Sequence, residues 1–135
     1  MKKLFSTRYS AGAFNVGLLL FRIAIGSLMM MHGYDKLTHF NEYAAQFMNF
    51  MGLGAKVSLG LCIFAEFFCS ILLILGFFTR LATIPLIITM CVIVFQVGKA
   101  DVFGKAEIGA LYLAGYVLIL FIGPGKASVD GLITK

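Results

Sequence analysis

The fold is decided by residues 55–97, which read AKVSLGLCIFAEFFCSILLILGFFTRLATIPLIITMCVIVFQV. Two apolar runs, 55–78 and 81–97, are separated only by Thr79 and Arg80. Each run is long enough to cross the hydrocarbon core of a bilayer as a helix. The short connection predicts a tight antiparallel hairpin with Arg80 at the membrane surface. Pro85 is expected in the first turn of the second helix, where its missing N–H costs little.

Further apolar runs lie on both sides of this hairpin, at residues 15–34 and 106–122. We therefore predict an all-α membrane protein, a bundle of four transmembrane helices within a single domain, 1–135. The chain is 61% hydrophobic and only 13% charged, whereas about a quarter of the residues in soluble domains are charged. No cleavage site of small residues follows the first run, so we expect it to be retained as a span.

Residues 40–51 form a shorter amphipathic pattern between the first two spans. A helix of about 12 residues is too short to cross the bilayer, so we predict an interfacial helix that lies at the membrane surface. A peptide-binding groove is the alternative use of its apolar face. The apolar positions at helical spacing are Phe40, Tyr43, Ala44, Phe47, Met48 and Met51.

The cations indicate an orientation and exclude one class of partner. The net charge is +5, but Lys and Arg are scattered singly, so no basic patch for nucleic acid is present. Four spans put both termini on one side, and the larger number of cations on that side predicts that both face the cytoplasm. The cations on that side are Lys2, Lys3, Arg8, Arg80, Lys126 and Lys135, against Lys36, Lys56, Lys99 and Lys105.

Polar residues inside the spans are the candidate functional residues, because a bilayer excludes them unless they face the bundle interior. Counted at 1.5 Å per residue, several of them reach similar depths from four different helices. We consider two arrangements. One is a structural ion pair such as Arg22 with Glu66; the other is a polar pocket in the outward half of the bundle. The pocket candidates are Arg22, His32, Lys36, Glu66, Gln96, Glu107 and Tyr112.

Two helical stripes support an inward orientation for these groups. Ser58, Cys62, Glu66 and Ser70 repeat every four residues on the second span. The first span carries a stripe of its own, formed by Arg22, Gly26, Met29, Gly33 and Lys36. Small residues allow helices to approach closely, so both stripes are expected to be packing faces.

Redox and metal chemistry have weaker support in the residues themselves. The three cysteines, Cys62, Cys69 and Cys91, contain no C-x-x-C pair and are expected to be small buried residues. Two histidines, His32 and His39, do not make a metal set or a haem site. Tyr112 and Tyr116 share one face of the fourth span, where they would pack or contact a quinone ring.

With these residues in place, the chain resembles the DoxX family of small bacterial membrane proteins. The resemblance rests on the order and spacing of short motifs: LFR at 20–22, MHGYDKL at 31–37, AE at 65–66, GFFTRL at 76–81 and GPGK at 123–126. Family positions that carry over are Arg22, His32, Gly33, Lys36, Glu66, Arg80 and Glu107. Relatives often have a histidine where this chain has Gln96, which weakens any role that needs a second histidine.

The resemblance implies a four-helix membrane fold and an association with redox work. Relatives are described as a subunit of a thiosulfate:quinone oxidoreductase or as membrane partners in oxidative-stress complexes. We therefore expect a membrane subunit of a redox or quinone-linked system that binds a small amphiphile. The cofactor is unknown, with quinone as the candidate, and redox membrane proteins or further copies of the chain are the candidate partners. The alternative is a non-enzymatic module that binds lipids or lipophiles or assists assembly; no complete catalytic motif decides between them.

Overall fold

The computed structural model describes residues 2–47, 50–97, 99, 101, 103–104 and 106–133, and the regular elements within them are all helices. This confirms the predicted all-α class. The longer bodies are α1 (Ala11–Thr38), α3 (Ala55–Ile63) continued by the π-helical segment η3 (Phe64–Cys69) and α4 (Ser70–Leu75), α5 (Thr79–Val92) continued by the π-helical segment η4 (Ile93–Val97), and α6 (Glu107–Ile122). The short ones are η1 (Lys2–Phe5), α2 (Phe40–Ala44), η2 (Phe50–Gly52) and α7 (Val129–Ile133).

Three of these bodies are long and apolar enough to cross a membrane: Ala11–Thr38, Ala55–Leu75 and Thr79–Gln96. They match the predicted spans 15–34, 55–78 and 81–97 with shifted ends. The predicted fourth span is α6, an apolar helix of 16 residues. Its length is about 24 Å, compared with about 30 Å for the hydrocarbon core of a bilayer. The fourth crossing therefore stays a prediction.

The connection between α4 and α5 differs from the predicted turn at Thr79 and Arg80. Helix α4 ends in a Schellman motif, in which Gly76 N–H bonds the Leu73 carbonyl and Phe77 N–H bonds the Leu72 carbonyl. Gly76 has φ +72°, a left-handed conformation that glycine adopts without strain. Thr79 and Arg80 already belong to the first turn of α5.

The position predicted for Pro85 is therefore also wrong. Because α5 begins at Thr79, Pro85 lies in the second turn of the helix, inside it. A proline there withdraws the N–H that would bond the Leu81 carbonyl. One turn later, the Thr89 hydroxyl donates a 2.8 Å hydrogen bond to the Pro85 carbonyl.

A continuous helix over 40–51 is absent from the described part of that segment. Helix α2 has only five residues, and Phe50–Gly52 forms a separate 3-10 turn in which Met51 has φ +54°. Met48 and Asn49 lie outside the described residues. The amphipathic pattern predicts a continuous helix, but the positive φ at Met51 and at Gly52 and Gly54 turns the chain before α3. An interfacial position for α2 stays a prediction.

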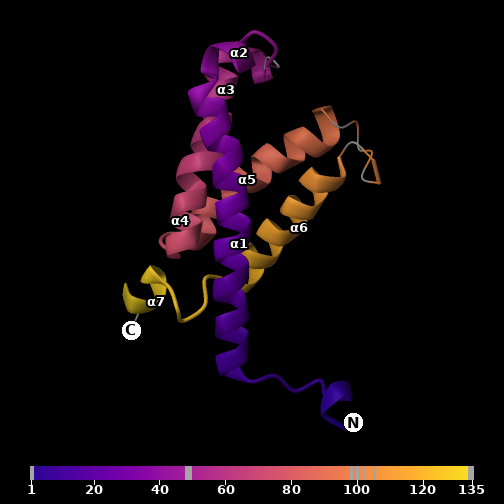
Figure 1. Ribbon diagram of the computed structural model, residues 1–135, viewed down its shortest axis with the longest axis vertical. Coiled ribbons are helices and arrows are strands. Elements are labelled where there is room, and N and C mark those ends of the chain that lie inside the picture. Colours follow the sequence, from indigo (N-terminus) through magenta and orange to yellow (C-terminus); the bar gives the residue numbers. More distant parts are fainter. Residues whose placement is uncertain are drawn as a thin grey trace.

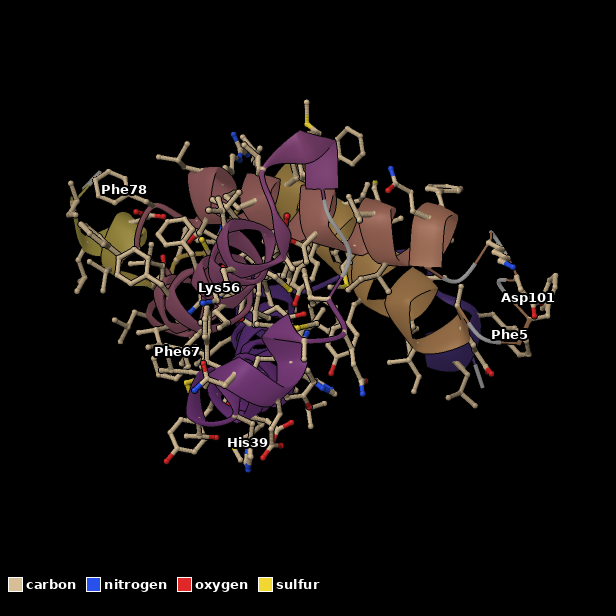
Figure 2. The ribbon with its side chains drawn as sticks, turned by 90° about the horizontal axis from the view of Figure 1, so that it is seen from above. Phe5, His39, Lys56, Phe67, Phe78 and Asp101 are labelled. Atoms are coloured by element: carbon tan, nitrogen blue, oxygen red, sulfur yellow. The ribbon has the colours of Figure 1, made fainter. Side chains whose placement is uncertain are left out.

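The helices are arranged around α1, which is the longest element (Figure 1). The α3–α4 body runs beside α1, while α5 and α6 lie together and are inclined to it, with their upper ends directed away from α1 (Figure 1). Large apolar side chains project outward around the molecule (Figure 2). Exposed ones include Leu20, Leu61, Leu81 and Phe121. This is the surface that a membrane protein presents to lipid. The buried centre is formed by Ile25, Met29, Cys69, Leu73, Ala82, Leu86, Met90, Tyr116 and Ile119.

Candidate functional site

The candidate site is built where α1 packs against the α3–α4 body. The two predicted stripes face one another there, and the members Ser58, Cys62, Glu66 and Ser70 are all buried. Gly33 of α1 makes this possible, because a Cβ at this position would lie only 2.7 Å from the Phe67 backbone nitrogen. A side chain larger than hydrogen would push the two helices apart. The prediction that both stripes are packing faces is confirmed.

Lys36 and Glu66 form an ion pair between these helices. The Lys36 ammonium lies 2.7 Å and 2.6 Å from the two carboxylate oxygens of Glu66. The Glu66 side chain is 2% exposed and that of Lys36 is 18% exposed, so this pair is largely removed from solvent. Cys62 adds a weak contact, with its sulfur 3.7 Å from the Lys36 nitrogen. Both oxygens of the carboxylate are therefore occupied by one cation.

Glu66 lies in the π-helical segment η3, which the sequence analysis did not foresee. A π-helix has a wider turn than an α-helix and places its side chains differently around the axis, and such segments are frequent at functional sites. The flanking helices α3 and α4 are regular, so the change of pitch is confined to the six residues around Glu66.

Arg22 does not pair with Glu66. The predicted Arg22–Glu66 ion pair is therefore wrong, because Lys36 takes the place of Arg22. The Arg22 side chain is 1% exposed and donates to three carbonyls at the opposite end of the α4 helix: Ala127 at 3.0 Å, Ile74 at 3.4 Å, and Pro124. Arg22 therefore ties the segment after α6 to the end of α4. Lys36, at the other end of the same α1 stripe, is the cation that reaches the carboxylate.

Aromatic residues form a second part of the site, on α6. The Tyr112 and Tyr116 rings stack with centroids 6.1 Å apart, and His32 of α1 meets Tyr112 edge-on at 6.2 Å. Tyr116 is fully buried, whereas His32 is exposed at the outer surface of α1. The Tyr116 hydroxyl and the Ser70 hydroxyl are both buried without a hydrogen-bond partner among the described residues.

Glu107 and Gln96 do not join this cluster. Both are exposed, Glu107 in the first turn of α6 and Gln96 in η4. Their predicted depths are similar to that of Glu66, but depth along a helix does not determine how far two residues on different helices lie from each other in the membrane plane. Because α5 and α6 are inclined to α1, their upper ends lie to one side of the α1 and α3 ends (Figures 1 and 2). The predicted convergence of four polar helices is therefore wrong for these two residues.

Two hollows among the described residues lie away from this cluster, and neither is lined by His32, Glu66 or Glu107. One, of about 380 Å³, lies beside α2 and contains Asp35, His39 and Tyr43. There Asp35 lies 3.3 Å from the His39 ring nitrogen Nδ1 and accepts a hydrogen bond from the Tyr43 hydroxyl. That bond raises the pKa of Tyr43 above its ordinary value, because it favours the protonated phenol.

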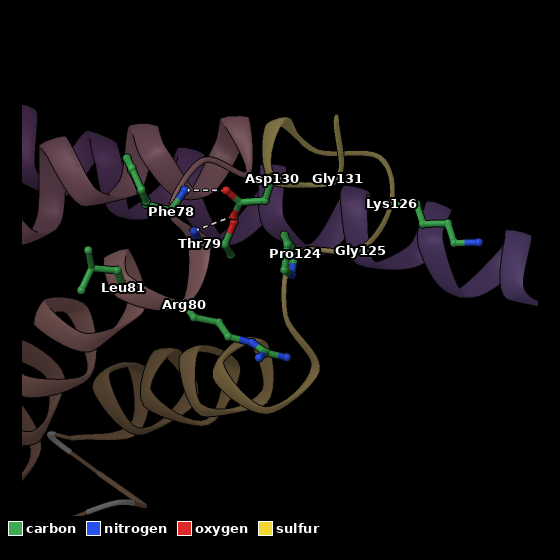
Figure 3. A pocket seen from close by; sticks show the side chains of 9 residues that line it. All are labelled: Phe78, Thr79, Arg80, Leu81, Pro124, Gly125, Lys126, Asp130 and Gly131. Atoms are coloured by element: carbon green, nitrogen blue, oxygen red, sulfur yellow. Dashed lines mark hydrogen bonds between the residues drawn. The ribbon is translucent and has the colours of Figure 1, made fainter. Parts of the chain in front are cut away.

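The larger hollow, of about 730 Å³, lies between the start of α5 and residues 124–131 (Figure 3). Asp130 of α7 accepts hydrogen bonds of 2.9 Å from the Phe78 and Thr79 backbone nitrogens. Partial burial alone would raise the pKa of Asp130, but these bonds and the Arg22 charge lower it overall. The sequence analysis missed this residue, because Asp130 caps a helix that begins 51 residues earlier in the chain.

The possible metal ligands and the cysteines were compared with the sequence-based expectations. Within them, no group of three or more His, Cys, Asp or Glu side chains is placed to hold a metal ion. The cysteines are free thiols; Cys62 and Cys69 are buried and Cys91 is partly buried. This agrees with the prediction that they are small packing residues.

Comparison with protein families identifies the family of this chain. The family model described as DoxX matches residues 17–99, which include most of α1, the α3–α4 body and α5. Comparison with curated proteins and with solved structures finds no match. The matched region contains Arg22, Lys36 and Glu66, and ends before α6.

Proposed function

The chain belongs to the DoxX family, whose members are small membrane proteins, and from this premise we propose that it is an integral membrane subunit of a redox or quinone-linked system. In this proposal the chain binds a small amphiphile at a polar site inside the bundle, between α1, α4 and α6. Lys36 and Glu66 form one side of the site. Tyr112, Tyr116 and Ser70 form the other.

The observation that carries the proposal is the pair of unpartnered hydroxyls in the interior. Tyr116 and Ser70 are fully buried, and neither hydroxyl has a partner among the described side chains and backbone groups. A buried hydroxyl without a hydrogen bond costs about 1 to 3 kcal/mol. A site that keeps two of them is suited to a guest that accepts hydrogen bonds.

The chemistry of the donors fits a quinone. A quinone carries two carbonyl acceptors on an apolar ring, and the site offers hydroxyl donors together with stacked tyrosine rings. The Glu66 carboxylate, the acceptor nearby, is suited to the hydroxyl groups of the reduced form. In this proposal the electrons come from a redox protein partner in the membrane.

Ligand titration tests the proposal. Detergent-purified protein would be titrated with decyl-ubiquinone, and binding followed by thermal shift and by tyrosine fluorescence. Tyr116→Phe removes only the hydroxyl, so we expect unchanged or slightly higher stability with up to about tenfold weaker quinone binding. Tyr9→Phe is the matched control, because Tyr9 is 80% exposed and lies before α1. Absence of saturable binding to the wild type, or equal affinity of Tyr116→Phe, contradicts the proposal.

A second candidate function is a non-enzymatic module for lipophile binding or for assembly of other membrane proteins. The closed Lys36–Glu66 pair favours it, because a carboxylate with both oxygens occupied is not free to handle protons or substrate. This candidate predicts that gently extracted protein carries a partner protein in native mass spectrometry and has no response to quinone. The quinone-linked proposal expects the opposite response to quinone.

We also propose the finer topology that accompanies this function. The chain is a single domain of four crossings in a bacterial inner membrane, with both termini in the cytoplasm and α2 at the interface. The position of Gly123, at the end of α6, supports the fourth crossing: a Cβ there would lie 3.1 Å from the Arg80 guanidinium, near the start of α5. Helix α6 thus returns to the level at which the α5 span begins.

A further inference from the structure

The hollow at the start of α5 is the strongest feature that the proposed function leaves unused. It lies at the end of two candidate spans, because the α3–α4 body ends at Leu75 and α5 begins at Thr79. In a bilayer this is the level of the lipid headgroups. The hollow is at the end of the molecule opposite to Lys36 and α2 (Figure 1), so an inference about it does not rest on the quinone site.

The charges in this hollow are predominantly positive. The guanidinium of Arg80 and the ammonium of Lys126 are exposed, and neither forms a hydrogen bond or ion pair with the described side chains and carbonyls. Asp130 is the acidic residue of the lining, and its two oxygens are engaged by the Phe78 and Thr79 backbone nitrogens. Arg22 is not one of the lining residues, and its two terminal nitrogens donate to the carbonyls of Pro124, Ile74 and Ala127. Figure 3 shows the Arg80 and Lys126 side chains extending away from the Asp130 carboxylate.

An exposed apolar ridge leads from the same hollow along α5. Phe78 and Leu81 belong to the lining, and Ile84 and Ile88 continue on the exposed side of the helix at spacings of three and four residues. These residues lie on one face of the helix. A molecule held at the cations would therefore have a continuous apolar surface beside it, directed into the bilayer.

From the cations, the apolar ridge and the level in the membrane, we propose that this hollow binds the headgroup of an anionic phospholipid. Arg80, next to Leu81, contacts the phosphate, the exposed Lys126 on the other side of the hollow adds attraction for the anionic headgroup, and the acyl chains follow the ridge of Leu81, Ile84 and Ile88 (Figure 3). The volume of about 730 Å³ accommodates a headgroup with its glycerol backbone. A lipid held there contacts α5 and the segment after α6, the two parts that Asp130 already joins through the Phe78 and Thr79 backbone nitrogens.

Native mass spectrometry with defined lipids tests this proposal. Protein in mild detergent would be titrated with phosphatidylglycerol and, separately, with phosphatidylcholine, and the apparent Kd obtained from the bound fraction. We expect tighter binding of phosphatidylglycerol, weakened about fivefold by Arg80→Gln and about fivefold by Lys126→Gln, since each interfacial cation contributes a factor of this size. Phosphatidylcholine binding should change little in both variants.

Lys56→Gln is the matched control, because Lys56 is exposed in the first turn of α3, at the other end of the bundle. Both Arg80 and Lys126 are exposed, so the variants should fold, which circular dichroism verifies. Equal affinity for the two lipids, or unchanged phosphatidylglycerol binding in the Arg80→Gln/Lys126→Gln double variant, overturns the proposal. Displacement of the lipid by millimolar inorganic phosphate would also overturn it, because it identifies a site for free phosphate.

Discussion

The ion pair between Lys36 and Glu66 allows a quantitative test of how this bundle is held together. We consider replacing each partner by an apolar residue of similar length, Lys36→Met and Glu66→Leu, and then both together. Each single substitution leaves one charge in a site that is 2% exposed at Glu66 and 18% exposed at Lys36. The double substitution leaves no charge.

The distances set the size of the expected effect. At 2.6 Å and an effective dielectric constant of about 20, the attraction between the two charges is about 6 kcal/mol. Most of that attraction only offsets the cost of removing both groups from water. When one partner is removed, the remaining charge is still buried but no longer has the attraction that offset its desolvation. Each single variant should therefore lose about 3 to 5 kcal/mol of stability. The double variant should lose much less than either single variant.

Unfolding in mixed micelles measures these differences. The protein would be titrated with sodium dodecyl sulfate in dodecyl maltoside, with helicity followed by circular dichroism, and the four free energies of unfolding combined in a double-mutant cycle. Lys56→Met serves as the control, because Lys56 is exposed and should contribute less than 0.5 kcal/mol. A double variant whose loss equals the sum of the single losses would refute the coupling, and a neutral Glu66→Leu would show that the carboxylate is not buried beside Lys36.

Three further predictions follow from close contacts elsewhere. Gly33→Ala should lower stability by at least 1 to 3 kcal/mol in the same assay, because its Cβ would meet the Phe67 backbone, whereas Gly17→Ala meets nothing within 4 Å and should be neutral or slightly stabilising. Arg22→Leu should lower stability by more than 3 kcal/mol by removing the donor from three carbonyls, while Arg8→Leu, which changes an exposed residue, should have little effect. Asp130→Asn should cost about 1 to 2 kcal/mol at neutral pH. Since the folded pKa of Asp130 lies below its ordinary value of 3.8, its contribution is fully present above that value and should disappear as the pH falls through the folded pKa; a constant difference between wild type and variant down to pH 2 would contradict this.

Much of this structure was predictable because lipid imposes strong constraints on sequence. The apolar runs located three long helices, since a span in lipid must satisfy its own backbone hydrogen bonds. The faces of those helices were predictable as well. Small and polar residues at positions 58, 62, 66 and 70 could not all face lipid, and all four are buried. The stripe on α1 was identified by the same reasoning, and its Gly33 lies against the backbone around Glu66.

The ends of the helices were harder to predict, because local residues can override an apolar run. The run 55–78 continues past Leu75 without a change in hydropathy, yet Gly76 ends the helix by adopting a left-handed conformation. The same displacement moved Thr79 and Arg80 into α5 and Pro85 into its interior. The π-helical segments Phe64–Cys69 and Ile93–Val97 have no comparable signal in the sequence, because their apolar residues are equally compatible with an α-helix.

The pairing of polar groups was the part that depth along a helix could not decide. Depth gives the position of a residue along the membrane normal only. Two side chains make contact only when their positions in the membrane plane agree as well. Arg22 and Lys36 lie on the same stripe of α1, 14 residues apart, and both are candidates for Glu66 until the register of α1 against α3 is known. The close approach at Gly33 fixes that register, because it sets the Glu66 backbone about one helical turn from Lys36 and about three turns from Arg22 along α1. Lys36 then closes on the carboxylate, and Arg22 is left at the end of α4 where only the carbonyls of Ile74, Pro124 and Ala127 are within its reach.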